Sequence, residues 1–182
     1  NITEGAGLAG ATIELVTVEA FAEAVDKFIA GECDIITTDG SALVGRRAVN
    51  DALNDWVIFP TSPISKEPLG PTYRSNDSAW ADVVNWTVYA TIIADEYGVT
   101  SANVDSVDTD ALPELGRLFG ANDGELQTKM GLDADAFYNV IKQVGNYDQI
   151  YSRNLNPLGL FREGGANDRW TNGGLIYAPP AR

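Results

Sequence analysis

Asp39 is the residue whose type and position in this sequence most favour chemistry. It follows the apolar run 35–38 (Ile-Ile-Thr-Thr), and Gly40 and Ser41 come directly after it. In open α/β sheets, ligands bind beyond the carboxyl ends of the strands, so a carboxylate at this point is well placed to pair with a ligand ammonium group. An Asp that precedes a helix starting near Ser41 is also a common helix cap. Spacing alone leaves both interpretations open.

The absence of histidine limits the chemistry that this chain can perform. None of the 182 residues is histidine, and Cys33 is the only cysteine. The commonest general base and zinc ligand, and every Ser-His or Cys-His nucleophile, are therefore excluded within the chain. A single cysteine also closes no disulfide within it. We expect no catalytic residues, no metal and no cofactor.

Two other patterns invite a functional interpretation and have a simpler one. Asp105, Asp108 and Asp110 resemble a calcium loop, but the spacing lacks the glycine and the distal glutamate of an EF-hand. We interpret them as helix caps and solvated charges. Trp80 and Trp86 could stack on a ligand, but residues six positions apart do not share a helical face, so core packing is the default.

The charge balance argues against nucleic acid as a partner. The chain carries 26 acidic and 12 basic residues, for a net charge of −14, and its longest basic run is Arg46-Arg47. Phosphate binding requires clustered Lys and Arg. No segment approaches the roughly 18 apolar residues of a membrane span, so we expect no membrane insertion. A hydrophobic content of 45% is typical of a globular protein with a core.

The first third of the chain alternates strand and helix patterns. Residues 12–16 are β-prone, Phe21, Val25, Phe28 and Ile29 fall on one helical face, and 35–38 reads as a buried strand. Strand, helix and strand at this spacing predict a right-handed βαβ unit with parallel strands. A helix over 41–50 and a strand over 56–59 are expected next.

Prolines mark the best candidate boundary. They occur at positions 60, 63, 68 and 71, so this stretch must be extended or turning. A long helix is predicted from 77 to 97, with a stop at Gly98 and an apolar stripe near the 3.6-residue period. Short helices follow, one of them from Asp133 to Gly145. The tail, 164–182, is rich in Gly, Asn and Pro and is predicted to wrap as a loop over a neighbouring surface.

Several long segments resemble one protein family. The run AGECDIITTDGSALVGRRA at 30–48 is similar to the second-lobe strand and helix of the general L-amino-acid-binding proteins of bacterial ABC importers. ISKEPLGPTYR at 64–74 resembles the segment that crosses between their lobes. WTVYATIIADEYGVTSANVD at 86–105 resembles the long helix and the start of the extension that sets this subfamily apart. The C-terminal signature of the subfamily is resembled by IKQVGNYDQIYSRNL at 141–155 and NPLGLFREGGANDRWTNGGLIYAPPAR at 156–182.

The resemblance implies an α/β fold, namely part of the type II periplasmic-binding-protein fold of solute-binding protein family 3. On this basis residues 1–63 belong to an incomplete second lobe with a parallel βαβ unit. Residues 64–74 are the inter-lobe crossing. Residues 75–182 form the helical C-terminal part of the first lobe with its extension. The rest of the first lobe is expected to precede residue 1, together with a cysteine partner for Cys33.

The same resemblance implies roles for two residues. Asp39 takes the α-ammonium group of the ligand, and Thr38 faces the ligand side chain. The α-carboxylate is held by an arginine of the first lobe and by a helix N-terminus of the second, whose partial positive charge suits an anion. Both of these lie outside the 182 residues. The resemblance therefore favours the ligand interpretation of Asp39 over the cap.

The implied function is capture of free L-amino acids in the periplasm of a Gram-negative bacterium and their delivery to the membrane permease of an ABC transporter. The ligand stabilises a hinge-closed form that docks on the permease. Two alternatives remain open at this point. One is a periplasmic dehydratase or lyase on the same fold, with Glu or Lys as acid and base. The other is the ligand-sensing lobe of a receptor.

Overall fold

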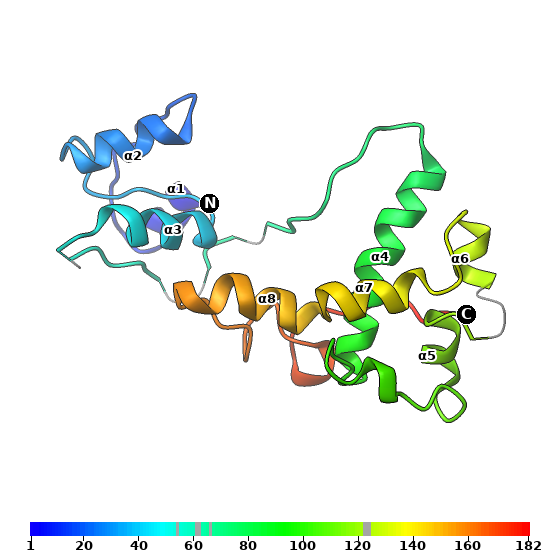
Figure 1. Ribbon diagram of the computed structural model, residues 1–182. Helices are drawn as coiled ribbons and strands as arrows, with labels where there is room; N and C mark the ends of the chain where they lie inside the picture. Colours follow the sequence, from blue (N-terminus) through cyan, green and yellow to red (C-terminus); the bar gives the residue numbers. More distant parts are fainter. Residues whose placement is uncertain (54, 61–62, 66, 122–124) are drawn as a thin grey trace. The chain divides into compact units, whose positions relative to one another are not determined.

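The computed structural model describes residues 1–53, 55–60, 63–65, 67–121 and 125–182. The described part is mostly helical (Figure 1). Its helices are α1 (Ile2–Leu8), α2 (Phe21–Ile29), α3 (Gly40–Asn50), α4 (Ser78–Glu96), η1 (Val104–Ser106), α5 (Pro113–Leu118), α6 (Glu125–Lys129), α7 (Ala136–Val144), α8 (Tyr147–Leu155), η3 (Asn156–Leu158) and η4 (Trp170–Asn172).

The chain divides into two compact units. Unit 1 is Asn1–Leu69 and unit 2 is Gly70–Arg182. That these units are parts of two lobes joined by a crossing segment at 64–74 stays a prediction. Lys66, within that segment, lies outside the described residues.

Two amphipathic helices form the framework of unit 1. The apolar face of α2 carries Phe21, Val25 and Phe28, and Gly31 follows the helix with φ of 73°, a left-handed conformation that glycine adopts without steric cost. Helix α3 begins at Gly40 and buries Val44. The predicted helices over these two segments are therefore confirmed.

The three predicted strands do not form a sheet. No strand is assigned at 12–16, 35–38 or 56–59, and no backbone hydrogen bond joins these segments within the described residues. The predicted βαβ unit is therefore wrong for this chain. A strand is held by N–H and C=O groups that pair with a neighbouring strand, and the described residues provide no such neighbour.

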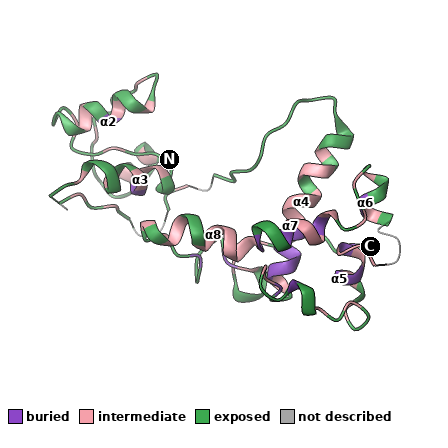
Figure 2. Ribbon diagram, viewed as in Figure 1, coloured by how far each residue is buried: buried purple, intermediate pink, exposed green. Residues whose placement is uncertain are grey.

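Helix α4 is the central element of unit 2. The Asp77 side chain caps it by accepting a hydrogen bond from the Trp80 backbone N–H at 3.0 Å, and Gly98 follows its end with φ of 68°. Residues 90–95 are buried, whereas Trp80 near the start is 54% exposed (Figure 2). The C-terminal part of α4 is therefore its most buried part.

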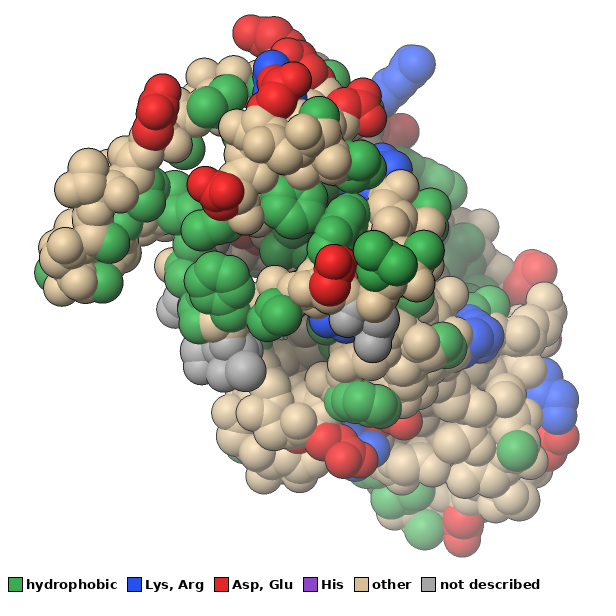
Figure 3. All heavy atoms as spheres, turned by 90° about the vertical axis from the view of Figure 1, so that its left-hand side faces the viewer, with side chains coloured by type: hydrophobic (Ala, Val, Ile, Leu, Met, Phe, Trp, Pro, Cys, Tyr) green, Lys and Arg blue, Asp and Glu red, His purple; other side chains and the backbone are tan. Residues whose placement is uncertain are grey.

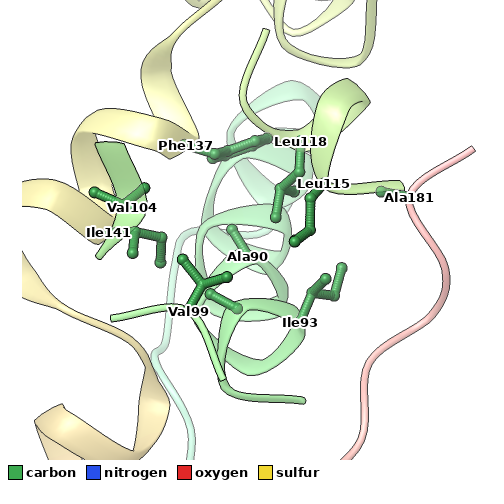
Figure 4. Close-up of a cluster of buried hydrophobic side chains, with 10 residues drawn as sticks. Ala90, Ile93, Val99, Val104, Leu115, Leu118, Phe137, Ile141 and Ala181 are labelled. Atoms are coloured by element: carbon green, nitrogen blue, oxygen red, sulfur yellow. The ribbon is translucent and has the colours of Figure 1, made fainter. Parts of the chain in front are cut away.

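The core of unit 2 joins elements that are far apart in the sequence. Helices α4, α5 and α7 meet there, together with η1 and the end of the tail (Figure 4). The buried cluster contains Ala90, Ile93, Ala94, Val99, Val104, Leu115, Leu118, Phe137, Ile141 and Ala181. Trp86 packs against it from α4. Trp86 thus contributes to the core, and Trp80 does not belong to this cluster.

Hydrogen bonds attach the tail to the helices of unit 2. The Trp170 indole N–H donates to Glu96 on α4 at 3.0 Å, and the Ala181 backbone N–H donates to Glu114 on α5 at 2.8 Å. The Arg117 Nε donates to the Ala181 carbonyl at 2.7 Å. The predicted tail that wraps over a neighbouring surface is confirmed.

Candidate functional site

Thr38 and Asp39 lie where an irregular segment of unit 1 turns into helix α3. Asp39 directly precedes Gly40, the first residue of the helix, and the Asp39 carbonyl accepts a hydrogen bond from the Leu43 backbone N–H at 3.0 Å. Thr38 and Asp39 are both exposed. The backbone therefore presents both side chains to solvent at a helix start.

Asp39 occupies the N-cap position without acting as a side-chain cap. Its φ and ψ are −55° and 141°, and its carboxylate accepts no capping hydrogen bond from the first turn of α3. An N-cap Asp normally accepts from the N–H two or three residues on. Asp39 therefore occupies the position that the cap interpretation predicts, but its carboxylate does not make the capping hydrogen bond. Its role toward a ligand stays a prediction.

An apolar hollow of about 80 Å³ lies between α2 and α3 in unit 1. We call it the α2–α3 hollow. It is lined by Phe21, Val25, Phe28, Asp34, Ile35, Ile36, Leu43, Arg46, Arg47, Trp56, Val57, Ile58 and Phe59. Neither Thr38 nor Asp39 lines it. Ligand pockets in proteins typically measure roughly 300–1,000 Å³, so this hollow is small for a ligand site.

Ring contacts order the wall of the α2–α3 hollow. Phe28 and Trp56 pack edge to face with ring centroids 4.9 Å apart. The Arg46 guanidinium lies over the Phe21 ring at 5.7 Å from its centroid. These contacts are typical of packing between helices and neighbouring chain. Sequence reasoning did not identify the hollow, although the apolar stripe of α2 indicated one of its walls.

A buried charge cluster lies in unit 2. The Asp95 carboxylate on α4 is fully buried and pairs with Arg162 at 2.6 Å and with Arg169 at 2.8 Å. Arg162 is 5% exposed, and it also pairs with Asp148 at 3.2 Å. Two guanidinium groups, Arg162 just before the tail and Arg169 within it, therefore enclose one carboxylate of the central helix.

This charge cluster attaches the C-terminal segment of the chain to helix α4. The Arg162 guanidinium lies over the Tyr147 ring at 4.9 Å from its centroid, and burial raises the pKa of Tyr147 above its usual value. Arg162 Nε also donates to the Asn167 carbonyl at 2.6 Å. Sequence reasoning missed this cluster. The signal was present, because Asp95 follows Ile92, Ile93 and Ala94 and places a charge at the end of an apolar run.

Asp105 and Asp108, two of the three aspartates that resembled a calcium loop, have protein partners for their carboxylates. Asp105 accepts hydrogen bonds from Tyr138 and Lys142, and Asp108 accepts from the backbone N–H of Asp110 at 3.1 Å. Asp108 thus caps a turn and not a helix, and Asp105 is a partly exposed carboxylate paired with Lys142. Among the described residues, no three His, Cys, Asp or Glu side chains are grouped to hold a metal ion. Nor is any described helix long and apolar enough to cross a membrane.

Curated proteins similar to this chain are amino-acid-binding proteins. It is 44% identical over 171 residues to the glutamate/glutamine/aspartate/asparagine-binding protein BztA of Rhodobacter capsulatus. It is 43% identical to the general L-amino acid-binding periplasmic protein AapJ of Rhizobium johnstonii and 39% identical to the putative amino-acid ABC transporter-binding protein YhdW of Escherichia coli K12. Each alignment covers 92% of this chain and 49% of the relative. No family model matches.

A solved structure of a periplasmic binding protein is also similar to this chain. The periplasmic binding protein of an ABC transporter from Brucella ovis, with glutathione bound, is 40% identical and superposes with a TM-score of 0.87 over 100% of this chain and 57% of that chain. The chain thus has part of a periplasmic-binding-protein fold. It spans about half the length of the curated relatives that it matches. This protein chain belongs to the periplasmic binding proteins of amino-acid ABC transporters, as a portion of such a protein.

Proposed function

We propose that the full-length protein is the substrate-binding component of an amino-acid ABC importer. It captures free L-amino acids in the periplasm and delivers them to the membrane permease. The observation that carries this proposal is the identity of 39–44% to three amino-acid-binding proteins, maintained over 92% of the chain.

Asp39 is the residue of this chain that we propose to bind the ligand ammonium group. It lies at a helix start, its side chain is exposed, and its carboxylate makes no capping hydrogen bond. An exposed carboxylate that makes no capping hydrogen bond can accept charge-assisted hydrogen bonds from an ammonium group. Thr38, the preceding residue, is exposed as well and would contact the ligand side chain. The carboxylate clamp would come from the rest of the full-length protein.

Glutathione is a second candidate ligand, because the Brucella ovis protein was solved with glutathione bound. The γ-glutamyl end of glutathione carries a free α-ammonium and a free α-carboxylate, as a free L-amino acid does. Asp39 would therefore have the same role for both ligands. What differs is the space needed beyond the α-carbon.

The two alternatives to transport find less support. The names of the relatives above describe binding proteins and no lyase or dehydratase. A sensor lobe would bind the same ligands but signal to a kinase instead of a permease. Reconstitution of uptake with the permease separates sensing from transport.

Titration calorimetry of the full-length protein with L-glutamate, L-glutamine and glutathione tests the proposal. We expect Asp39→Asn to weaken binding of each ligand by about 30- to 900-fold, because an ammonium group in a closed cleft loses its counter-ion. The thermal stability of the unliganded protein should hardly change, since the Asp39 side chain makes no capping hydrogen bond that the substitution would remove.

Asp34→Asn provides the matched control. Asp34 precedes Asp39 by five positions, is also exposed, and lines the α2–α3 hollow. Its substitution should leave all three affinities unchanged. If Asp39→Asn binds the three ligands with wild-type affinity, the role of Asp39 is disproved. If the wild-type protein binds none of them, the proposed function itself fails.

A further inference from the structure

We propose that Asp39 and Gly40 form a site of spontaneous backbone isomerisation, at which the unliganded protein converts aspartate to isoaspartate. The modification itself holds whatever the function of the protein. Its effect on ligand binding rests on the proposed function, because Asp39 is the residue that we propose to bind the ligand ammonium group.

The chemistry needs no reactant other than water. The Gly40 nitrogen attacks Cγ of Asp39, the new N–Cγ bond forms and one water molecule leaves, which gives a five-membered succinimide ring. Water then opens the ring. Addition at Cγ restores aspartate, whereas addition at the main-chain carbonyl carbon leaves the chain linked through Cγ as isoaspartate. The product has the same mass as the starting chain, and nothing is oxidised or reduced.

The first support is the accessibility of the attacking nitrogen. Gly40 carries no Cβ that would shield it. Its backbone N–H makes no hydrogen bond within the described residues, because it belongs to the first turn of α3 and Asp39 does not cap that turn with its side chain. Gly40 is exposed, and no described residue lies within 4 Å of a Cβ built at its position.

The second support is the freedom of the Asp39 carboxyl group. Asp39 is exposed and accepts no capping hydrogen bond. Figure 3 shows acidic side chains that protrude from the side of the molecule that includes α2 and α3. Ring closure requires the carboxyl group to turn toward the Gly40 nitrogen, which opens the hydrogen bond between the Leu43 N–H and the Asp39 carbonyl. Helix ends open at little free-energy cost.

The pair Asn172-Gly173 shows the opposite condition. An Asn-Gly pair closes the same ring with ammonia as the leaving group. Here, however, Nδ2 of Asn172 donates to Asp168 at 3.1 Å, and the Gly173 N–H donates to the Trp170 carbonyl at 3.1 Å. Both reacting groups are therefore held, whereas those at Asp39 and Gly40 are free. The second Asp-Gly pair of the sequence, at 123–124, lies outside the described residues.

Storage of the full-length protein without ligand at neutral pH, followed by peptide mapping with fragmentation that distinguishes isoaspartate, tests the proposal. Free peptides of residues 34–43 and 168–177 give the unrestrained rates. Isomerisation at Asp39 should proceed within about tenfold of the rate in its peptide, because the helix end opens readily. Deamidation at Asn172 should be slowed at least about tenfold more strongly relative to its own peptide.

Ligand links the modification to binding. L-glutamate at 100 times its Kd should slow isomerisation at Asp39 about 100-fold, because only the unliganded fraction reacts. The rate at the pair 123–124 serves as the reference and should not respond to L-glutamate. In stored protein, calorimetry should show that the fraction of binding sites lost equals the isoaspartate fraction, with the Kd of the remaining sites unchanged.

Two substitutions in the full-length protein change the rate in opposite directions. Gly40→Ala places a Cβ beside the attacking nitrogen, in space that is open among the described residues, and should slow isomerisation at least about fivefold in a folded protein. Asp39→Asn creates an Asn-Gly pair. On storage it should lose ammonia, and the fraction that hydrolyses to aspartate should regain affinity for L-glutamate.

Absence of isoaspartate at Asp39, while the free peptide isomerises, would overturn the proposal. Equal rates in Gly40→Ala and the unsubstituted protein, or equal protection of Asp39 and Asn172, would overturn it as well. Isomerisation at one rate with and without bound L-glutamate would support the modification site and count against Asp39 as a ligand residue. If L-glutamate, L-glutamine and glutathione all fail to bind, the proposed function fails, and isoaspartate at Asp39 still supports the modification.

Discussion

Units 1 and 2 of this polypeptide differ in how completely they enclose their hydrophobic side chains. Unit 2 buries a cluster of ten hydrophobic residues that joins α4, α5, α7, η1 and the tail. Helix α2 of unit 1 is about as amphipathic as α7 of unit 2, yet the apolar face of α2 borders an open hollow. A strong local pattern therefore specifies a helix in both units. Closure of a core depends on whether the matching surface is in the same chain.

The tail explains much of the difference. It contacts α4 through Arg169 and Trp170 and α5 through Ala181, so a segment distant in the sequence covers the core of unit 2. Arg162, just before the tail, adds a second ion pair to Asp95 on α4. The described part of unit 1 has no equivalent closing segment with buried charges. Three predictions test whether this contrast is energetic as well as geometric.

The largest effect is expected from Asp95→Asn. The change keeps the size of the side chain and removes the charge that balances Arg162 and Arg169, both of which remain in place. Loss of one member of a buried ion pair costs about 3–5 kcal/mol, so urea unfolding of the chain should show a correspondingly lower stability of unit 2.

Glu96→Gln is the control for Asp95→Asn. Glu96 is the next residue and accepts a hydrogen bond from the Trp170 indole, which a glutamine oxygen can also accept. Partial burial raises the pKa of Glu96, so the neutral side chain should cost little. Similar losses from both substitutions would show that the buried pair has no special role in closing unit 2.

A smaller effect distinguishes the two cores directly. Val104 in unit 2 is 3% exposed and Val25 in unit 1 is 5% exposed, so the same substitution can be made at equal burial. Val104→Ala should cost about 2 kcal/mol, because a closed core keeps the cavity. Val25→Ala should cost less than about 1 kcal/mol, because its surroundings border an open hollow and can collapse. Hydrogen exchange of α4 and α2 amides measures each cost locally, and equal costs would contradict the contrast.

The smallest effect is a pH dependence of the tail. Asp168 accepts hydrogen bonds from the backbone N–H groups of Gly164 and Arg169, and these bonds hold its pKa below the usual value. The unfolded chain, with a pKa near 3.9, binds a proton more readily than the folded one. The resulting stability is present above about pH 3.9 and is lost as the pH falls through the lower folded pKa.

Acid titration of the chain, followed by amide exchange at Gly164 and Arg169, checks this dependence. Asp168→Asn should flatten the loss of protection below about pH 4. Glu163→Gln, a change at an exposed residue directly before the tail, should leave the profile as it is in the unsubstituted chain. An unchanged profile in Asp168→Asn would assign the acid sensitivity of unit 2 to other groups.

Helices α2, α3, α4 and α7 were predictable because their information is local. The apolar stripe of α2, Asp77 at the start of α4 and Gly98 after it act within a few turns of chain, and the structure places them as expected. The position of Asp39 before α3 was predictable for the same reason. Its ligand role stays a prediction, because the other half of the clamp is expected outside this chain.

What the sequence determined by itself is therefore the helices, their stops and the absence of histidine chemistry. The tertiary structure decided which apolar runs are covered. Residues 35–38 read as a buried strand, but a strand requires a partner, and none is present in the described residues. Asp95 lies in the predicted helix 77–97, but its partners Arg162 and Arg169 lie 67 and 74 positions further along the chain. Both outcomes depend on contacts between distant segments, and no local pattern encodes such contacts.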